Sequence, residues 1–141
     1  MKIKYIALIA SMLFFSASAC RKNPNRNPYL QDVSFDISIN LDLPQYASLQ
    51  YPGSSLYIAQ GGIKGIFVFN TGDAYNAFEA SDPNHYPNDC SLMQLDGTSV
   101  LCPCENNRYS LTDGHLMSGE GNYGLKPYHV SLNGNMLHIY N

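Results

Sequence analysis

The chain has 141 residues, with eight Lys and Arg against 11 Asp and Glu, and a formal net charge of −3. This length supports one hydrophobic core and is too short for two ordinary domains. After the first 30 residues the only cations are Lys64, Arg108 and Lys126. Because phosphate contacts need clustered Lys and Arg, a nucleic-acid-binding role is disfavoured.

The first 20 residues have the features of an export signal. Two lysines precede an apolar stretch at 5–15, and small residues at 16–19 lead to Cys20. The apolar stretch is shorter than the roughly 20 residues that cross a bilayer as a helix, so we expect a cleaved signal peptide. A cysteine directly after Ala-Ser-Ala resembles the bacterial lipobox, although Ala17 stands where Leu is usual. The alternative is a chance cysteine near an ordinary cleavage site.

The predicted organisation has three parts. Residues 1–19 are the signal peptide, residues 20–30 are a lipidated N-terminus and flexible tether, and residues 31–141 form the folded domain. The tether prediction rests on residues 21–28, which hold three Asn, two Pro and three basic residues. Removing the signal leaves six Lys and Arg against 11 acids, a net charge of −5. We expect a protein anchored by lipid in the bacterial cell envelope, facing the periplasm or on the outer membrane.

Short strands separated by turns are expected throughout the domain. Between Val33 and Leu43 the apolar residues fall on every second position, which predicts a half-buried strand. No window of a dozen residues outside the signal has a sustained helical period. We therefore predict an all-β domain, a small antiparallel barrel or sandwich. Further strands are expected at 56–59, 63–70, 74–80, 91–95, 98–101, 128–132 and 136–140, with turns at Thr71-Gly72-Asp73, Asp96-Gly97 and Asn133-Gly134.

The cysteines predict one disulfide. If Cys20 is lipidated, Cys90, Cys102 and Cys104 remain, and an exported protein meets conditions that permit disulfides. One bridge and one free thiol follow. Because Cys102 and Cys104 are separated by a single residue, a bridge between them would be strained. Cys90 is expected to pair with one of these two.

The C-terminal third resembles the second half of a Rieske domain. Cys102-Pro103-Cys104-Glu105 is followed by a strand-like stretch at 106–111, by Thr112-Asp113-Gly114, and by a Leu-x-x-Tyr-x-Val pattern within 124–130. Rieske domains have a Cys-Pro-Cys-His loop followed by the same succession of elements. The resemblance implies a Rieske-like (ISP domain-like) fold, and it maps the disulfide that braces the two cluster loops onto Cys90 and Cys104.

The cluster ligands of a Rieske centre are largely missing. That centre needs two thiolates and two imidazoles from two loops. In the second loop the resemblance places Cys102 at a thiolate position, but Glu105 stands at the histidine position. In the first loop, at 81–89, the expected Cys-x-His falls either on Asp82-Pro83-Asn84 or on His85 and Pro87, and neither register restores both ligands. We expect no bound cofactor. The residual cluster-site positions are Asp82, His85, Cys102 and Glu105.

Two hypotheses cover the whole chain. The first is a non-catalytic Rieske-like lipoprotein that acts as a binding or structural subunit. Its lipid anchor would contact the membrane, and its partner would be an envelope protein. The alternative is an electron-transfer protein with an atypically ligated [2Fe-2S] cluster, using His85, Cys102 and Glu105 with Asp82 or Asn84. Carboxylate or amide ligands would leave such a cluster prone to hydrolysis.

Two further hypotheses concern the same residues. Asp82, His85, Cys102 and Glu105 together could form a mononuclear site, because a zinc-like ion accepts oxygen, nitrogen and sulfur ligands in a tetrahedron. The simpler interpretation is that the acids are solvated loop residues and that Cys102 is a small buried side chain. Alternatively, Cys102 exchanges with the disulfide, although no Cys-x-x-Cys motif is present.

Nothing in the sequence predicts an enzyme. No Gly-x-Ser-x-Gly, His-Glu-x-x-His or phosphate-binding loop occurs. His115, His129 and His138 lie in or beside predicted strands, where alternation places some of them on the solvent face, and we do not expect them to be ligands.

Overall fold

The computed structural model describes residues 26–141, which form ten strands, one short 3-10 helix and no α-helix. The predicted signal peptide, Cys20 and the first part of the predicted tether lie outside the described residues. Within the described part of the chain, no helix is long and apolar enough to cross a membrane. The elements are β1 (Asp36–Asn40), η2 (Ala47–Gln50), β2 (Ser55–Ile58), β3 (Ile66–Asn70), β4 (Tyr75–Glu79), β5 (Gln94–Asp96), β6 (Ser99–Leu101), β7 (Arg108–Ser110), β8 (Leu116–Ser118), β9 (Pro127–Asn133) and β10 (Met136–Tyr140).

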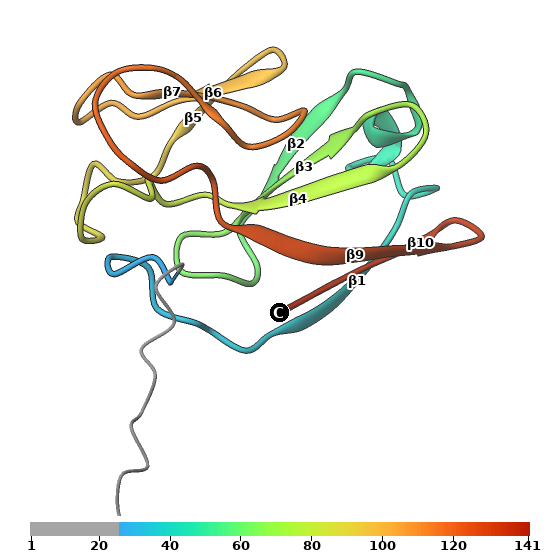
Figure 1. The fold of residues 1–141 in the computed structure, drawn as a ribbon. Helices are drawn as coiled ribbons and strands as arrows, with labels where there is room; N and C mark the ends of the chain where they lie inside the picture. The colour runs from blue at the N-terminus through green and yellow to red at the C-terminus, as the bar shows by residue number, and fades with distance from the viewer. Residues whose placement is uncertain (1–25) are drawn as a thin grey trace, which may run out of the picture.

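The larger sheet has six antiparallel strands in the order β1-β10-β9-β4-β3-β2. It curls, so that β1 and β10 lie below β2, β3 and β4 in Figure 1. Apolar side chains on the inside of this curl form one hydrophobic core, which includes Ile39, Leu49, Val68 and Ile139. The prediction of an all-β antiparallel fold is confirmed.

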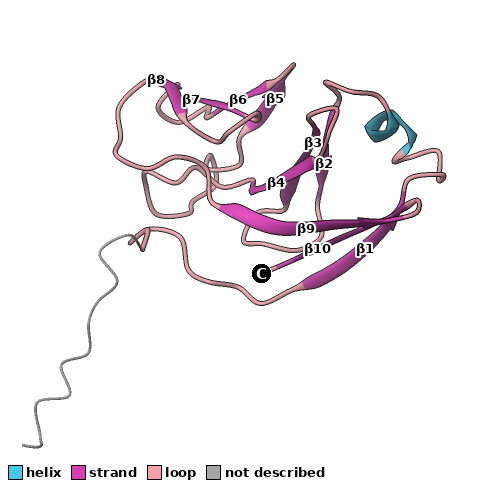
Figure 2. Cartoon of the chain, turned by 45° about the vertical axis from the view of Figure 1, so that its right-hand side comes forward, coloured by secondary structure: helices cyan, strands magenta, loops and turns pink. Residues whose placement is uncertain are grey.

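The smaller sheet has four antiparallel strands in the order β5-β6-β7-β8 and lies beside β2, β3 and β4 (Figure 2). A second core fills the space between the two sheets. β3 serves both cores, since Ile66 and Val68 face the first whereas Phe67 and Phe69 face the second. All five residues of β3 are therefore buried, which explains its continuous apolar run.

The predicted hairpins are present. The loops are one position later than predicted in two hairpins: Asn133 ends β9 and Gly134-Asn135 joins it to β10, and Asp96 ends β5 and Gly97-Thr98 joins it to β6. The stretch 71–74, which contains Thr71-Gly72-Asp73, joins β3 to β4. Gly134 and Gly97 have φ values of 59° and 62°, a conformation that Gly adopts without steric cost.

Three strand predictions extended too far, one of them over 63–70, where β3 begins only at Ile66. The strand expected over 33–43 forms only from Asp36 to Asn40, because the Asn40 side chain accepts the backbone N–H of Asp42 at 2.9 Å and starts a turn. In the stretch 91–95, regular pairing begins only at Gln94. One strand, β8, had no counterpart among the predicted strands, because three residues are too few to show an alternation of apolar and polar side chains.

Candidate functional site

Two loops at one end of the smaller sheet meet to form the candidate site. The first loop, residues 80–93, joins β4 to β5, and the second loop, residues 102–107, joins β6 to β7. A disulfide between Cys90 and Cys104 links them, with 5.5 Å between the Cα atoms. This pairing is the one that the resemblance implied, and it leaves Cys102 as a free, buried thiol.

The second loop is a tight turn that directs Cys102 inward. The Cys102 N–H donates to the Asn107 carbonyl at 2.8 Å, and the Asn106 N–H donates to the Cys102 carbonyl at 3.0 Å. Asn106 has a φ of 59°, a left-handed conformation that Asn tolerates better than most residues. Cys102 and Asn107 are fully buried, whereas Glu105 between them is exposed.

His85 of the first loop faces Cys102 of the second. The His85 Nε2 lies 3.6 Å from the Cys102 Sγ. On the other side of the ring, Nδ1 lies 3.0 Å from the Tyr86 carbonyl. A carbonyl oxygen only accepts hydrogen bonds, so in the neutral ring Nδ1 carries the proton and Nε2 presents its lone pair to the thiol.

Asp82 lies at the base of the first loop and is fully buried. Its Oδ1 accepts the Tyr109 hydroxyl at 3.0 Å and the Asn84 N–H at 2.7 Å. Its Oδ2 has only a longer contact, 3.5 Å, to the Asn107 Nδ2. Burial, together with the neighbouring Asp82 carboxylate, raises the pKa of Tyr109, which keeps this phenol a hydrogen-bond donor at neutral pH.

The same Asn107 amide reaches Glu105, whose Oε2 lies 3.4 Å from Nδ2. The amide orientation is fixed because the Asn107 Oδ1 accepts the Glu120 N–H at 2.9 Å. Ligand atoms of Asp82, His85 and Glu105 all lie within 4.8 Å of one another, and so do those of His85, Cys102 and Cys104. His85 belongs to both groups, so it lies beside Cys102 on one hand and beside the two carboxylates on the other. Cys104 cannot add a thiolate because its sulfur is in the disulfide.

Burial raises the pKa of the Cys102 thiol to about 11, and the nearby Asp82 adds to the shift. Backbone N–H groups of Cys104 and Glu105 oppose it by favouring the thiolate. In the absence of a bound cation, Cys102 is a protonated thiol at neutral pH.

These groups do not fit a Rieske [2Fe-2S] cluster. Two thiolates and two imidazoles are required, and the candidate site offers one thiol, one imidazole and the carboxylates of Asp82 and Glu105. The other three histidines lie elsewhere: His115 contacts Asp113, His138 contacts Asp36, and His129 stacks on the ring of Tyr140.

Asn84 has a role that sequence reasoning missed. One of the two predicted registers of the first loop placed Asn84 at a ligand position. In the structure its side-chain amide instead holds the Gly-rich loop before β9, residues 119–124. Its Oδ1 accepts the N–H groups of Asn122 and Tyr123 at 2.9 and 3.0 Å, and its Nδ2 donates to the Tyr123 carbonyl and the Tyr109 hydroxyl. A Cβ on Gly121 would lie 2.3 Å from this amide, so Gly is required there. No local pattern identifies these contacts, since they join residues 25 to 39 positions apart.

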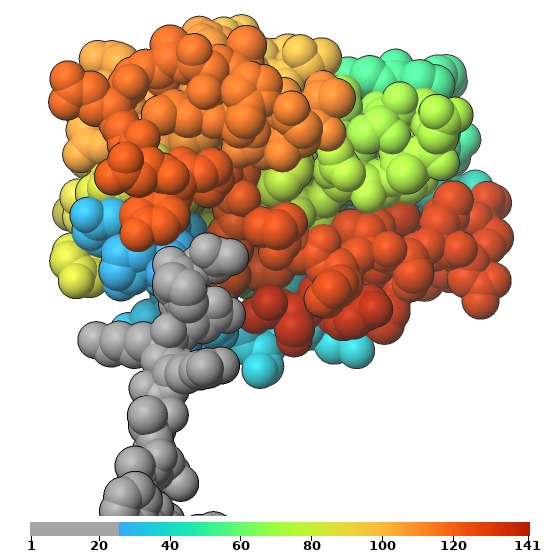
Figure 3. Space-filling view, in the orientation of Figure 1, coloured from blue at the N-terminus to red at the C-terminus, as the bar shows by residue number. Residues whose placement is uncertain are grey.

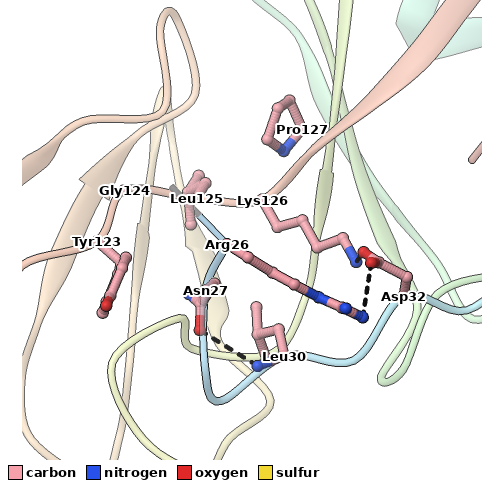
Figure 4. Close-up of a pocket in the computed structure, with 9 residues that line it drawn as sticks. All are labelled: Arg26, Asn27, Leu30, Asp32, Tyr123, Gly124, Leu125, Lys126 and Pro127. Atoms are coloured by element: carbon pink, nitrogen blue, oxygen red, sulfur yellow. Dashed lines mark hydrogen bonds and ion pairs between the residues drawn. The ribbon is translucent and has the colours of Figure 1, made fainter. Parts of the chain in front are cut away.

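The start of the described chain also packs against the site. The Asn27 Nδ2 donates to the Pro83 carbonyl at 2.7 Å, and Leu30 is buried. Asp32 pairs with both Arg26, at 2.9 Å, and Lys126, at 2.7 Å (Figure 4). In Figure 3 the start of the described chain, drawn in blue, contacts the red-orange segment before β9. Packing of the chain thus begins before residue 31, because residues predicted as tether find partners in distant loops.

No protein-family model matches the chain, and no curated protein matches it. Among solved structures, a chain of the complex of reduced oxygenase and oxidised ferredoxin in carbazole 1,9a-dioxygenase is 18% identical, with a TM-score of 0.50, and the match covers 74% of this chain and 92% of that one.

Two other solved structures have lower scores. The Sphingomonas yanoikuyae B1 ferredoxin is 18% identical over 73% of this chain and 99% of that one, with a TM-score of 0.47. A putative NADH-dependent nitrite reductase small subunit from Mycobacterium tuberculosis is 16% identical over 78% and 97%, with a TM-score of 0.47. At these identities the likeness concerns the fold, and the described chain has a Rieske-like fold, a curled antiparallel sheet with a smaller second sheet that carries the two loops.

Proposed function

We propose that this protein is a non-catalytic lipoprotein of the bacterial cell envelope, a binding or structural subunit whose Rieske-like domain carries no [2Fe-2S] cluster. One observation supports this most strongly. The two loops offer one imidazole, His85, beside one thiol, Cys102, where a Rieske centre needs two of each. Cys102 is the one free thiol among the described residues, because Cys90 and Cys104 form the disulfide.

The experiment that tests this is an iron and acid-labile sulfide assay with a visible absorption spectrum. The full chain is expressed with iron and cysteine supplied and purified without oxygen. We expect a folded, colourless protein with neither iron nor sulfide. Two irons and two sulfides per chain, with visible charge-transfer absorption, would contradict the proposal and would favour the alternative, an electron-transfer protein with atypical ligands.

Membrane attachment is part of the proposal and rests on the sequence before residue 26. Cys20 follows a signal-like segment and is expected to carry the lipid. Cells grown with a radiolabelled fatty acid test this. We expect label in the wild-type chain and none in Cys20→Ala, with Cys90→Ala as the cysteine control that keeps the label. An unlabelled wild-type chain would contradict lipidation.

Protein binding is supported by aromatic surface beside the first loop. Tyr86 is 69% exposed, and its ring lies edge-on to that of Tyr29, with 5.2 Å between the ring centroids. Tyr123 packs against Tyr29 in the same way at 6.1 Å. Aromatic residues are enriched at protein interfaces, where they bury a large area at low entropic cost. We propose that an envelope protein contacts this surface.

A photo-crosslinker in place of Tyr86 tests this contact in intact cells. We expect crosslinks to a discrete protein band. The control places the crosslinker at Tyr51, which is 70% exposed and lies before β2, far along the chain from the two loops. Absence of a band at position 86, or the same band from position 51, would contradict a binding surface at Tyr86.

A further inference from the structure

We propose that one Zn²⁺ ion binds between the two loops, held by one imidazole, one thiolate and two carboxylates. This inference rests on the proposed absence of a [2Fe-2S] cluster, because both would occupy the same space. The four residues are Asp82, His85, Cys102 and Glu105.

The imidazole of His85 is prepared for a metal. Histidines that bind metals commonly donate their other ring N–H to a carbonyl or carboxylate, which fixes the tautomer and the ring orientation. Here Nδ1 lies 3.0 Å from the Tyr86 carbonyl, with the Ser91 hydroxyl at 3.4 Å as a second neighbour. The free lone pair on Nε2 consequently points into the space between the loops, toward Cys102.

The spacing of the nitrogen and sulfur atoms suits zinc. An ion bonded tetrahedrally to a nitrogen at about 2.05 Å and a sulfur at about 2.3 Å holds these two atoms about 3.5 Å apart. The observed distance from the His85 Nε2 to the Cys102 Sγ is 3.6 Å. Binding releases the Cys102 proton to solvent, and the bond to zinc forms from the thiolate lone pair.

Asp82 supplies a buried negative charge that lacks a cation. None of the five ion pairs among residues 26–141 includes Asp82. Glu79, the other fully buried acid, differs because both of its oxygens accept donors at 2.6 to 2.9 Å. The Asp82 Oδ2 has a longer contact, 3.5 Å to the Asn107 Nδ2, and the Asp82 carboxyl group also neighbours the Cys102 thiol, so a cation placed there would contact both. A buried charge is costly without a partner, and a divalent cation would offset that cost.

Glu105 completes the set from the solvent side. It is exposed, and its carboxylate lies within 4.8 Å of ligand atoms of Asp82 and His85, so a movement of its side chain toward Cys102 brings it to the ion. Asn107, fixed by Glu120, places its Nδ2 between the two carboxylates and helps to hold both near the ion. The donor set of one nitrogen, one sulfur and two oxygens favours Zn²⁺ over Mg²⁺ or Ca²⁺, which take oxygen ligands.

Zinc affinity is the direct test. The full chain, purified without metal from the cell fraction in which it accumulates, is titrated with zinc in competition with a chromogenic chelator. We expect one zinc per chain. In His85→Ala and Glu105→Gln the affinity should fall by more than about tenfold, because even groups that only orient metal ligands contribute roughly 10–100-fold.

Two matched variants control for charge and for histidine loss. Glu120→Gln removes an exposed acid beside Asn107, and His129→Ala removes an exposed histidine of β9. Both should bind zinc as the wild type does. Cobalt provides a second measurement, since a Co²⁺–thiolate bond absorbs in the near ultraviolet, and this absorption should be lost in Cys102→Ser. Circular dichroism checks that each variant is folded.

A colourless, iron-free protein that does not bind zinc, or that binds it equally in Glu105→Gln and Glu120→Gln, would overturn the zinc site while the proposed function stands. Zinc binding without cobalt–thiolate absorption would overturn the assignment of Cys102. Iron and sulfide in the purified protein would instead contradict the proposed function itself.

Discussion

The His85 Nε2 and the Cys102 Sγ lie 3.6 Å apart although their residues are 17 positions apart in the sequence. This contact and the Cys90–Cys104 disulfide both join the first loop to the second. At the place where a Rieske cluster would need thiolates and imidazoles, the protein therefore has one of each and two carboxylates.

Cys102 should resist alkylation in the folded protein when no metal is bound. It is fully buried, and its raised pKa of about 11 keeps it as a thiol at neutral pH, whereas the nucleophile is the thiolate. Mass spectrometry after treatment with iodoacetamide should find Cys102 unmodified in the native state and modified in denaturant. Rapid native labelling would contradict this and would support exchange between Cys102 and the disulfide.

Reducing the disulfide should lower the free energy of unfolding. The Cys90–Cys104 bridge closes a loop of about 15 residues, which corresponds to about 3 kcal/mol in the chain-entropy estimate. Urea denaturation of the wild type and of a Cys90→Ser, Cys104→Ser double variant measures the difference. A loss below about 1 kcal/mol would mean that hydrogen bonds alone hold the two loops together.

Glu79→Gln should be strongly destabilising. The Glu79 carboxylate is fully buried and accepts the N–H groups of Ile63, Lys64 and Ser81 and the Tyr128 hydroxyl. An amide replaces one accepting oxygen by a donor that faces other donors, and hydrogen bonds to a charged group contribute about 1.5–3 kcal/mol each. We expect a loss of about 3 kcal/mol in urea denaturation.

The control for this prediction is Glu120→Gln, which changes an exposed acid of the same charge and should have little effect. Equal stability of the two variants would show that the Glu79 network does not hold the loop before β3.

The free energy of unfolding should fall as the pH rises above about 9. Burial raises the pKa of Cys102 to about 11 and also raises the pKa of Tyr109 and Tyr128. In the unfolded chain these groups lose their protons first, so the native state binds more protons, and stability decreases with pH. Tyr109→Phe and Cys102→Ser should each flatten this decrease between pH 9 and about 11. Urea denaturation across that interval measures the slope, and a slope unchanged in both variants would contradict the assignment.

The sequence was sufficient for the parts of the fold that depend on local rules. The predicted hairpins form at Gly134 and Gly97, whose positive φ values favour Gly, although each two-residue loop begins at the glycine and not at the Asn133 or Asp96 before it. The alternation around Ile37 and Ile39 marks β1. Alternation alone did not show where β1 ends, because the turn at Asn40 depends on a hydrogen bond from its own side chain.

The candidate site could be predicted in its residues but not in its geometry. The resemblance identified Asp82, His85, Cys102 and Glu105, and the structure places His85 beside Cys102 and also beside the two carboxylates. The residues that orient these four side chains were not predicted. Asn107 and Tyr109 are ordinary polar residues in the sequence, and their importance comes from contacts with Asp82 at a separation of 25 and 27 residues.

Electron paramagnetic resonance of intact cells tests the central claim most directly, because no cluster can be lost during purification. Cells that overproduce the full chain are reduced with dithionite and compared with cells that lack it. A reduced [2Fe-2S] centre has one unpaired electron spin, and we predict that no such signal appears with overproduction. A new signal that rises with the amount of protein and disappears in Cys102→Ser would contradict the absence of a cluster.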